Sequence, residues 1–124
     1  MLAADTAVVL AEELFAKPRD QREGLAMLAA LSGKTHRVLT AVALQTQAGL
    51  STVVSQTQVT FRELTEAEQM RYWNTGEPLG KAGGYAVQGL AAGFITRIEG
   101  SYSGVMGLPL AETAGLLSAA GIPI

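Results

Sequence analysis

Hydrophobic and polar positions alternate along two neighbouring stretches in the middle of the chain. Residues 36–44 are rich in Val, Thr and Leu, and residues 51–61 alternate polar with apolar side chains. Alternation with a period of two is typical of a strand that has one solvated face. Because only the short stretch 45–49 separates the two segments, we predict an antiparallel hairpin. Residues 93–99 alternate in the same way and predict a further strand, which Gly100 ends.

The pattern over residues 2–16 leaves two alternatives open. Its alanines, leucines and glutamates favour a helix, whereas the run Thr-Ala-Val-Val-Leu at residues 6–10 is typical of a short buried strand. Lys17 and Pro18 end this unit in either case, because the residue before a proline is disfavoured in a helix.

Capping residues and helical spacing of apolar positions predict two helices in the first two thirds of the chain. Asp20 precedes Glu23 at the spacing of a capping box, and apolar residues follow at helical intervals, so we predict a helix over residues 20–32. The pair Thr65 and Glu68 repeats that spacing and starts a short second helix.

A last helix is predicted over residues 110–120, between Pro109 and Gly121, because proline favours the first turn of a helix and glycine the position after its end. Helices and strands therefore follow one another in mixed order. This order predicts one domain over residues 1–124 of the α/β class, with α+β as the alternative, built on a mixed, partly antiparallel sheet flanked by helices.

The segment of residues 76–89 is unusually rich in glycine and proline, which occupy six of its fourteen positions. Glycine permits positive φ and a close approach of backbone to ligand, so a glycine-rich segment that carries one cation, Lys81, suits a polyanion such as a phosphate chain. The alternative is a flexible surface loop. The Walker pattern of phosphate-binding loops does not occur in the segment, so spacing alone does not decide between the two.

Composition narrows the class of protein and of partner. Hydrophobic residues make up 48% of the 124 positions and the net charge is -2, which favours a folded domain and argues against a nucleic-acid-binding surface. No apolar run reaches the length of a membrane span, so we expect no membrane partner and a cytoplasmic location. The mean hydropathy of +0.25 is high for a soluble monomer, so we expect a covered apolar surface and a homodimer.

Asp5 and His36 are the ionisable residues whose positions in apolar surroundings need an explanation. A carboxylate near a buried strand end is costly unless it is paired, bound to a metal or used in catalysis, although position alone favours a capping or turn aspartate. His36 is the only histidine, and it opens a predicted strand. A lone histidine at such a position is more often structural than catalytic.

Several motifs resemble the Maf family of nucleoside triphosphate pyrophosphatases, in the family's order along nearly the whole chain. The matching segments are residues 4–6 (Ala-Asp-Thr), 17–18 (Lys-Pro), 31–38 (Leu-Ser-Gly-Lys-Thr-His-Arg-Val), 76–89, 98–103 and 105–110. The resemblance implies a Maf/ITPase-like fold with a strand at residues 3–10, a turn and a short return strand. It also implies that the family's N-terminal third, with a Ser-x-x-Arg-Arg phosphate loop, does not precede Met1. A truncated product and a misassigned start are both open.

The resemblance assigns roles to five residues of this chain. Asp5 corresponds to the proposed catalytic acid, which accepts a proton from the attacking water and helps to hold a divalent cation, Mg²⁺ or Mn²⁺. Lys17 and Lys81 correspond to lysines that contact the triphosphate. Thr6 and Gln88 correspond to positions associated with the choice of nucleobase. Supporting positions around the pocket are expected at Glu77, Tyr85, Ser101 and Tyr102.

The motifs are most similar to the branch of the family that hydrolyses dTTP and UTP to the nucleoside monophosphate and pyrophosphate. The family's roles in removing surplus nucleotides and in arrest of septum formation are implied in the same way. The alternative is a nucleotide-binding or dimerising fragment with impaired catalysis, because the N-terminal phosphate loop supplies much of the charge stabilisation in the family.

Overall fold

The computed structural model describes residues 1–122, and its centre is a five-stranded sheet of order β2-β1-β3-β4-β5. The strands are β1 (Leu2–Leu10), β2 (Glu13–Phe15), β3 (Thr35–Thr46), β4 (Gly49–Phe61) and β5 (Ile95–Glu99). Each recorded pairing between neighbours is antiparallel. The α/β class is confirmed, and the described part of the sheet is antiparallel throughout.

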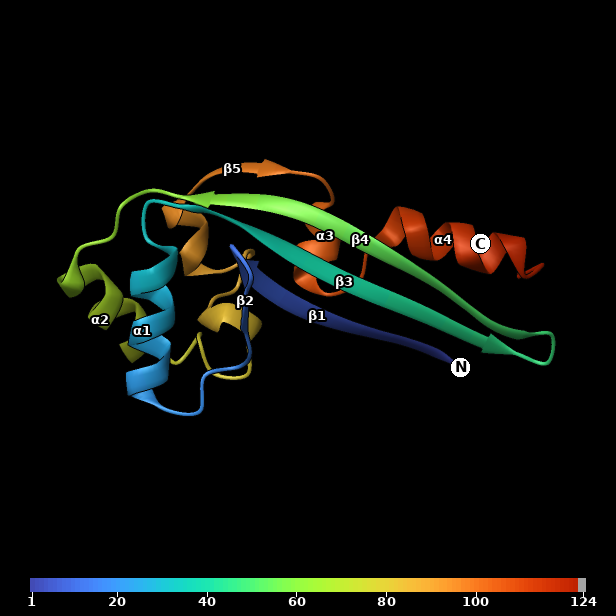
Figure 1. The fold of residues 1–124 in the computed structure, drawn as a ribbon, viewed down its shortest axis with the longest axis horizontal. Helices are drawn as coiled ribbons and strands as arrows, with labels where there is room; N and C mark the ends of the chain where they lie inside the picture. Colours follow the sequence, from blue (N-terminus) through green and yellow to red (C-terminus); the bar gives the residue numbers. More distant parts are fainter. Residues whose placement is uncertain (123–124) are drawn as a thin grey trace.

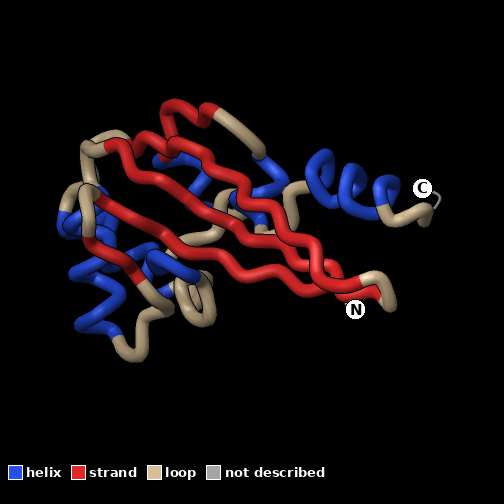
Figure 2. The backbone as a smooth tube through the Cα atoms, turned by 45° about the vertical axis from the view of Figure 1, so that its right-hand side comes forward, coloured by secondary structure: helices blue, strands red, loops and turns tan. Residues whose placement is uncertain are grey.

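Helices lie at one end of this sheet, near its middle and toward its other end (Figure 1). They are α1 (Gln21–Leu31), α2 (Glu66–Asn74), α3 (Tyr102–Met106) and α4 (Leu110–Ala119), with short 3₁₀ turns η1 (Ala82–Gly84) and η2 (Leu90–Phe94). Figure 1 shows α1 and α2 together at one end, and α4 beside the far half of the β3–β4 hairpin. Figure 2 shows the long strands running side by side between these two groups of helices. No helix among residues 1–122 is both long enough and apolar enough to span a bilayer.

The strand alternative for the first segment is confirmed, since β1 turns at Ala11 and returns as β2. Ala11 adopts φ 54°, the left-handed region in which a glycine is usual, so the turn forms without one. The predicted hairpin is also confirmed, because β3 and β4 pair from Thr35 opposite Thr60 to Thr46 opposite Gly49.

The helix ends follow the predicted capping residues with one exception. Thr65 and Glu68 form both halves of a capping box at the start of α2. The Asp20 carboxylate accepts from the backbone N–H of Glu23 at 2.9 Å, as predicted. The reciprocal bond is absent there, because the Glu23 carboxylate accepts instead from the backbone N–H of Arg19 at 2.8 Å. The short helix α3 and the two 3₁₀ turns were not predicted.

One face of the sheet carries most of the core. Along β3 the residues His36, Val38, Thr40, Val42 and Leu44 are buried, whereas the residues between them are half-buried or exposed. This alternation places the even-numbered side chains of β3 on the face that packs against the helices and the glycine-rich segment. The opposite face is more open to solvent.

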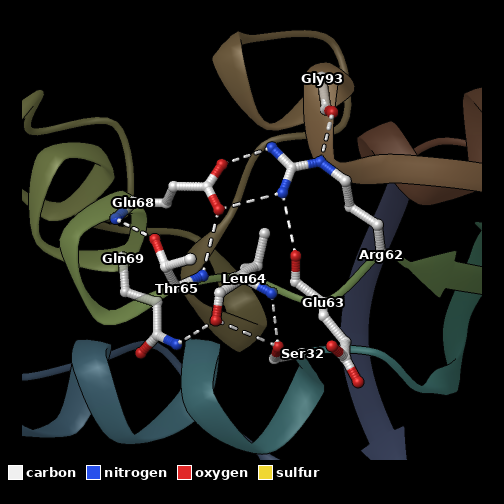
Figure 3. Close-up of polar contacts among 8 residues, drawn as sticks. All are labelled: Ser32, Arg62, Glu63, Leu64, Thr65, Glu68, Gln69 and Gly93. Carbon is white, nitrogen blue, oxygen red and sulfur yellow. Dashed lines mark hydrogen bonds and ion pairs between the residues drawn. The ribbon is translucent and has the colours of Figure 1, made fainter.

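A cluster of polar contacts joins the end of β4 to α2 and η2 (Figure 3). The Arg62 guanidinium donates to both carboxylate oxygens of Glu68, at 3.1 and 2.6 Å, and to the carbonyl oxygens of Glu63 and Gly93, at 2.9 and 3.4 Å. The Arg62 side chain holds the pKa of Glu68 down to about 2. The Arg62 guanidinium thus links the end of β4 to α2 and to η2.

The same cluster reaches α1 through the backbone of Leu64. The Leu64 N–H donates to Ser32 Oγ at 2.7 Å, and Gln69 Nε2 donates to the Leu64 carbonyl at 3.1 Å (Figure 3). Nearby, α1 and α2 touch where Trp73 lies over Gly24, so closely that a Cβ at Gly24 would stand 2.2 Å from the indole ring. Trp73 is therefore part of the helix-helix contact.

Candidate active site

A cavity of about 260 Å³ lies where β1, the segment after β2, the glycine-rich segment and the turn after α3 meet. Four of the five residues singled out in the sequence line it, namely Asp5, Thr6, Lys17 and Lys81. A larger cavity of about 450 Å³ lies between β2 and α1, but apolar side chains such as Phe15 and Met27 dominate its wall. The smaller cavity therefore has the chemistry of a polar ligand site.

Gln88 is not among the residues that line this cavity. It is exposed, between the buried Val87 and the start of η2. Its assignment to nucleobase choice thus has no geometric support in this structure and stays a prediction.

Asp5 and Thr6 leave β1 on opposite faces of the sheet. Asp5 stands in a row with Ala41 and Val54, all three exposed, whereas Thr6 stands in a row with the buried residues of the core face. The Asp5 Oδ1 atom accepts from the Thr6 backbone N–H at 3.0 Å. The expectation that burial constrains Asp5 is wrong, because β2 pairs only with residues 8–10 of β1 and leaves the edge beside Asp5 open within residues 1–122.

Thr6 is held by a hydroxyl of the neighbouring strand. Its Oγ1 lies 3.0 Å from Thr40 Oγ1, and Thr40 donates to the Gly104 carbonyl at 2.7 Å. Thr40 was not among the predicted site residues. No local motif marks this residue, and its partnership with Thr6 follows only from the register of β1 against β3.

Lys17 and Lys81 are exposed, and their ammonium groups take part in none of the hydrogen bonds or ion pairs found among residues 1–122. A backbone bond brings the two segments together, since the Gly83 N–H donates to the Ala16 carbonyl at 3.1 Å. Two cations that line one cavity and form no ion pair within residues 1–122 favour an anionic ligand.

The second half of the glycine-rich segment is packed against the core, so the alternative of a flexible surface loop is wrong for residues 83–87. Residues 83–87 are buried. Gly80, Gly83 and Gly84 adopt φ of 75°, 73° and 76°, which L side chains rarely do. At Gly83 a Cβ would also stand 3.0 Å from the side chain of Val8, so this position needs glycine for space as well.

Three side chains fasten this segment. Tyr72 Oη accepts from the Ala86 N–H at 3.1 Å, and Tyr85 Oη lies 2.6 Å from His36 Nε2. Glu77 reaches across the segment, where its Oε1 accepts from the Leu90 N–H at 2.9 Å. Glu77 therefore ties the two ends of the segment together and does not line the cavity.

Of the other expected supporting residues, Tyr85 lines the cavity, whereas Ser101 and Tyr102 do not. Ser101 Oγ accepts from the Gly104 N–H at 3.0 Å and so caps α3. The structural role of His36 is supported by its complete burial, which lowers its pKa to about 4 and keeps the imidazole neutral at neutral pH. Burial also raises the pKa of Tyr85.

Comparison with protein families identifies the chain. The family model described as Maf-like protein matches residues 1–120. The chain belongs to the Maf family.

Curated Maf relatives are similar over nearly all of this chain. A protein of Saccharophagus degradans is 53% identical over 123 residues, one of Alkalilimnicola ehrlichii is 61% identical over 117, and one of Bordetella avium is 56% identical over 124. These alignments cover 99%, 94% and 100% of this chain, but 59%, 57% and 62% of the three relatives. Each relative is named dTTP/UTP pyrophosphatase. The chain thus spans about three fifths of the length of these relatives.

The donor set of the cavity bears on the divalent cation that Maf membership implies. Among residues 1–122, no three His, Asp or Glu side chains gather as a metal site, and Asp5 is the carboxylate that lines the cavity. Magnesium is commonly held by one or two carboxylates together with water and substrate phosphates. A cation that arrives with a phosphate ligand would fit this donor set, and a role of Asp5 as its protein ligand stays a prediction.

Proposed function

We propose that this Maf chain hydrolyses dTTP and UTP to the nucleoside monophosphate and pyrophosphate. The observation that carries the proposal is one cavity lined by Asp5 and by two lysines, Lys17 and Lys81, that form no ion pair within residues 1–122. Relatives that align with nearly the whole chain are named for this activity, which supports the choice of substrate.

In the proposed reaction Asp5 accepts a proton from the water that attacks the nucleotide. Its exposure leaves the carboxylate accessible to water, and its bond to the Thr6 N–H orients it. Lys17 and Lys81 bind the triphosphate and neutralise the charge that grows on the leaving pyrophosphate. Mg²⁺ or Mn²⁺ at Asp5 would withdraw charge from the phosphate oxygens.

Recognition of the base is assigned to Thr6 and Gln88. A glutamine amide offers both a donor and an acceptor, as the edge of a pyrimidine requires. Because Gln88 lies outside the cavity wall, its role requires that the base extend from the cavity toward the start of η2.

A second candidate is a nucleotide-binding fragment that does not turn its ligand over. The observation that favours it is the open surroundings of Asp5, with one carboxylate at the cavity and an unpaired edge of β1 beside it. Loss of even a few charge-stabilising contacts costs orders of magnitude in rate, about tenfold for each 1.4 kcal/mol.

We also propose that two copies of the chain associate. Large apolar side chains are exposed on the far half of the β3–β4 hairpin, where Leu50 and Val54 are each 63% exposed. An exposed apolar surface of this kind is typical of a protein–protein interface. The cytoplasmic location and the links to nucleotide clearance and septum formation stay predictions.

The decisive experiment measures pyrophosphate release from dTTP, UTP, dCTP and GTP with Mg²⁺ or Mn²⁺, for the chain and for Asp5→Asn. Glu12→Gln is the matched control, because Glu12 is an exposed carboxylate in the turn after β1 and does not line the cavity. We expect release from dTTP and UTP that Asp5→Asn lowers at least a hundredfold and Glu12→Gln leaves unchanged. Binding of dTTP without release, in a folded sample, would favour the second candidate.

A further inference from the structure

The hydroxyl of Thr6 is the last member of a short chain of hydrogen bonds that runs out of the core into the cavity. Thr40 is fully buried on β3, and its Oγ1 lies 2.7 Å from the carbonyl oxygen of Gly104 and 3.0 Å from Thr6 Oγ1. Thr6 is only partly buried and lines the cavity. These two hydrogen bonds therefore connect α3 to the ligand site through Thr40 and Thr6.

The direction of each bond follows from the number of protons available. A carbonyl oxygen has no proton to donate, so the proton in the Thr40–Gly104 bond belongs to Thr40. A hydroxyl has only one proton, so Thr40 can only accept from Thr6. Thr6 thus donates to Thr40, and what its Oγ1 offers to the cavity is a lone pair.

We propose that Thr40 is a positioning residue that fixes Thr6 Oγ1 as a hydrogen-bond acceptor, so that the cavity selects ligands that present an N–H or O–H at this point. The inference rests on the proposed function, because it takes the ligand of the cavity to be a nucleotide. Thr40 itself would touch no ligand, and the ligand must present a hydrogen-bond donor to Thr6 Oγ1.

The required polarity distinguishes nucleotides that have nearly the same shape. Thymine and uracil carry a proton on N3, whereas the N3 atom of cytosine is an acceptor that would face the lone pair of Thr6. A sugar hydroxyl is a second source of the same donor chemistry. A site built to pair with a donor rejects a ligand that lacks it, because a partly buried polar group is then left unpaired.

The test measures dissociation constants of the non-hydrolysable α,β-imido analogues of dTTP, dCTP, N3-methyl-dTTP and 2′,3′-dideoxythymidine triphosphate. We expect the chain to bind the dTTP analogue about tenfold more tightly than the dCTP and N3-methyl analogues, which is the effect of about one hydrogen bond. If only the dideoxy analogue binds more weakly, the donor lies on the sugar. That result would also support Thr6 Oγ1 as a hydrogen-bond acceptor.

Thr40→Val tests the positioning role, because the variant lets the Thr6 hydroxyl turn and donate. The preference for dTTP over dCTP should then fall toward one, mainly through tighter binding of the dCTP analogue. Thr57→Val is the matched control, since Thr57 is equally buried and donates to the Ser101 carbonyl at 3.2 Å, but has no bond to Thr6. If Thr40 has only a structural role, Thr40→Val should show the same preference for dTTP over dCTP as Thr57→Val.

Thr6→Val and Thr6→Ser keep the inference testable if Thr40→Val does not fold. If the unaltered chain selects for a donor on the base or on the sugar, Thr6→Val should lose that selectivity. Thr6→Ser, which keeps the hydroxyl, should retain it. Unchanged selectivity in Thr6→Val, or in folded Thr40→Val, would overturn the inference alone. If the folded chain binds none of the analogues, the proposed function fails and the inference with it.

Discussion

His36 is completely buried in a cluster of aromatic rings, and its surroundings decide its charge. Its ring centroid lies 5.2 Å from that of Phe61 and 5.4 Å from that of Tyr85, in both cases edge to face. Its Nδ1 atom has no hydrogen-bond partner among residues 1–122. A protonated imidazole would have no counter-charge there, so the fold is built around the neutral ring.

The stability of the chain should therefore depend on His36 in mildly acidic solution. The pKa of His36 is about 4 in the folded chain against 6.5 for an unperturbed histidine, so between these values the unfolded chain binds the extra proton. Stability is full above pH 6.5 and falls as the pH drops toward 4, by about 3 kcal/mol in total. Urea unfolding at pH 4 to 8 measures this slope, and His36→Gln should flatten it. An equal slope in the variant would contradict the assignment.

Tyr85→Phe should separate the hydrogen bond to His36 from the packing of the ring. The variant keeps the ring against Phe61 but leaves His36 Nε2 without its partner at 2.6 Å. We expect a loss of about 1 to 3 kcal/mol in the free energy of unfolding, since a buried polar atom becomes unsatisfied. Chemical denaturation measures the loss, with the exposed Tyr102→Phe as the control that should change nothing.

At the scale of elements, the packing of α1 against α2 overrides helix propensity. Replacing a glycine inside a helix by alanine usually stabilises the helix by up to about 1 kcal/mol. At Gly24 the added Cβ would stand 2.2 Å from the Trp73 ring, whereas at Gly115 in α4 it would meet no atom within 4 Å among residues 1–122, apart from its chain neighbours and the backbone of its own helix. The two glycines therefore have opposite consequences on substitution.

Gly24→Ala is expected to destabilise the chain by about 1 to 3 kcal/mol and Gly115→Ala to stabilise it by up to about 1 kcal/mol. Thermal unfolding gives the two changes in Tm. Fluorescence of Trp73, the only tryptophan, reports the displaced ring in the first variant. A stabilised Gly24→Ala chain would mean that Trp73 moves aside without cost.

The arginine fork at the end of β4 makes a further prediction for α2. Arg62→Lys keeps the charge but loses the paired donation to Glu68 and the bonds to the carbonyls of Glu63 and Gly93. We expect a lower Tm and faster hydrogen exchange at the start of α2 and in η2. Arg71→Lys, in the last turn of the same helix, should leave both unchanged.

What the sequence predicted at this scale was local. Capping residues and alternation give the start of α2 and the β3–β4 hairpin, because those signals lie within a few residues of the structure they cause. The packing of the glycine-rich segment was not predictable in this way, since Tyr72 and His36, which hold it, lie on other elements. Four of the residues to which the family resemblance assigned roles line one cavity. Strand alternation, however, places the side chains of Asp5 and Thr6 on opposite faces of the sheet.

At the scale of the whole molecule, the sheet extends well beyond α1 and α2 (Figure 1). The far half of β1, β3 and β4 has α4 beside it but exposes several apolar side chains, among them Leu2, Leu50 and Val54. Part of the exposed apolar surface is therefore located at this end of the molecule, whereas other exposed apolar side chains, such as Leu14, Leu79 and Leu90, lie elsewhere.

Association of copies should occur through this end. Sedimentation of the chain over a range of concentrations should show a dimer, and Val54→Lys should shift it toward monomer because a charge would be buried on association. The matched control is Leu79→Lys, a comparably exposed apolar residue in the glycine-rich segment, away from the far end of the hairpin. A monomer at all concentrations, or equal effects of the two variants, would refute association through this surface.

The backbone bond between Gly83 and Ala16 has a consequence for how the site comes into being. It joins a segment that follows the second strand to one that follows the second helix, so the two lysines become neighbours only when the sheet and both helices have docked. A partly folded chain in which one of these two segments has not docked would have one lysine, instead of two, positioned to bind a phosphate chain. A nucleotide that binds both lysines should therefore stabilise the folded chain relative to partly folded forms.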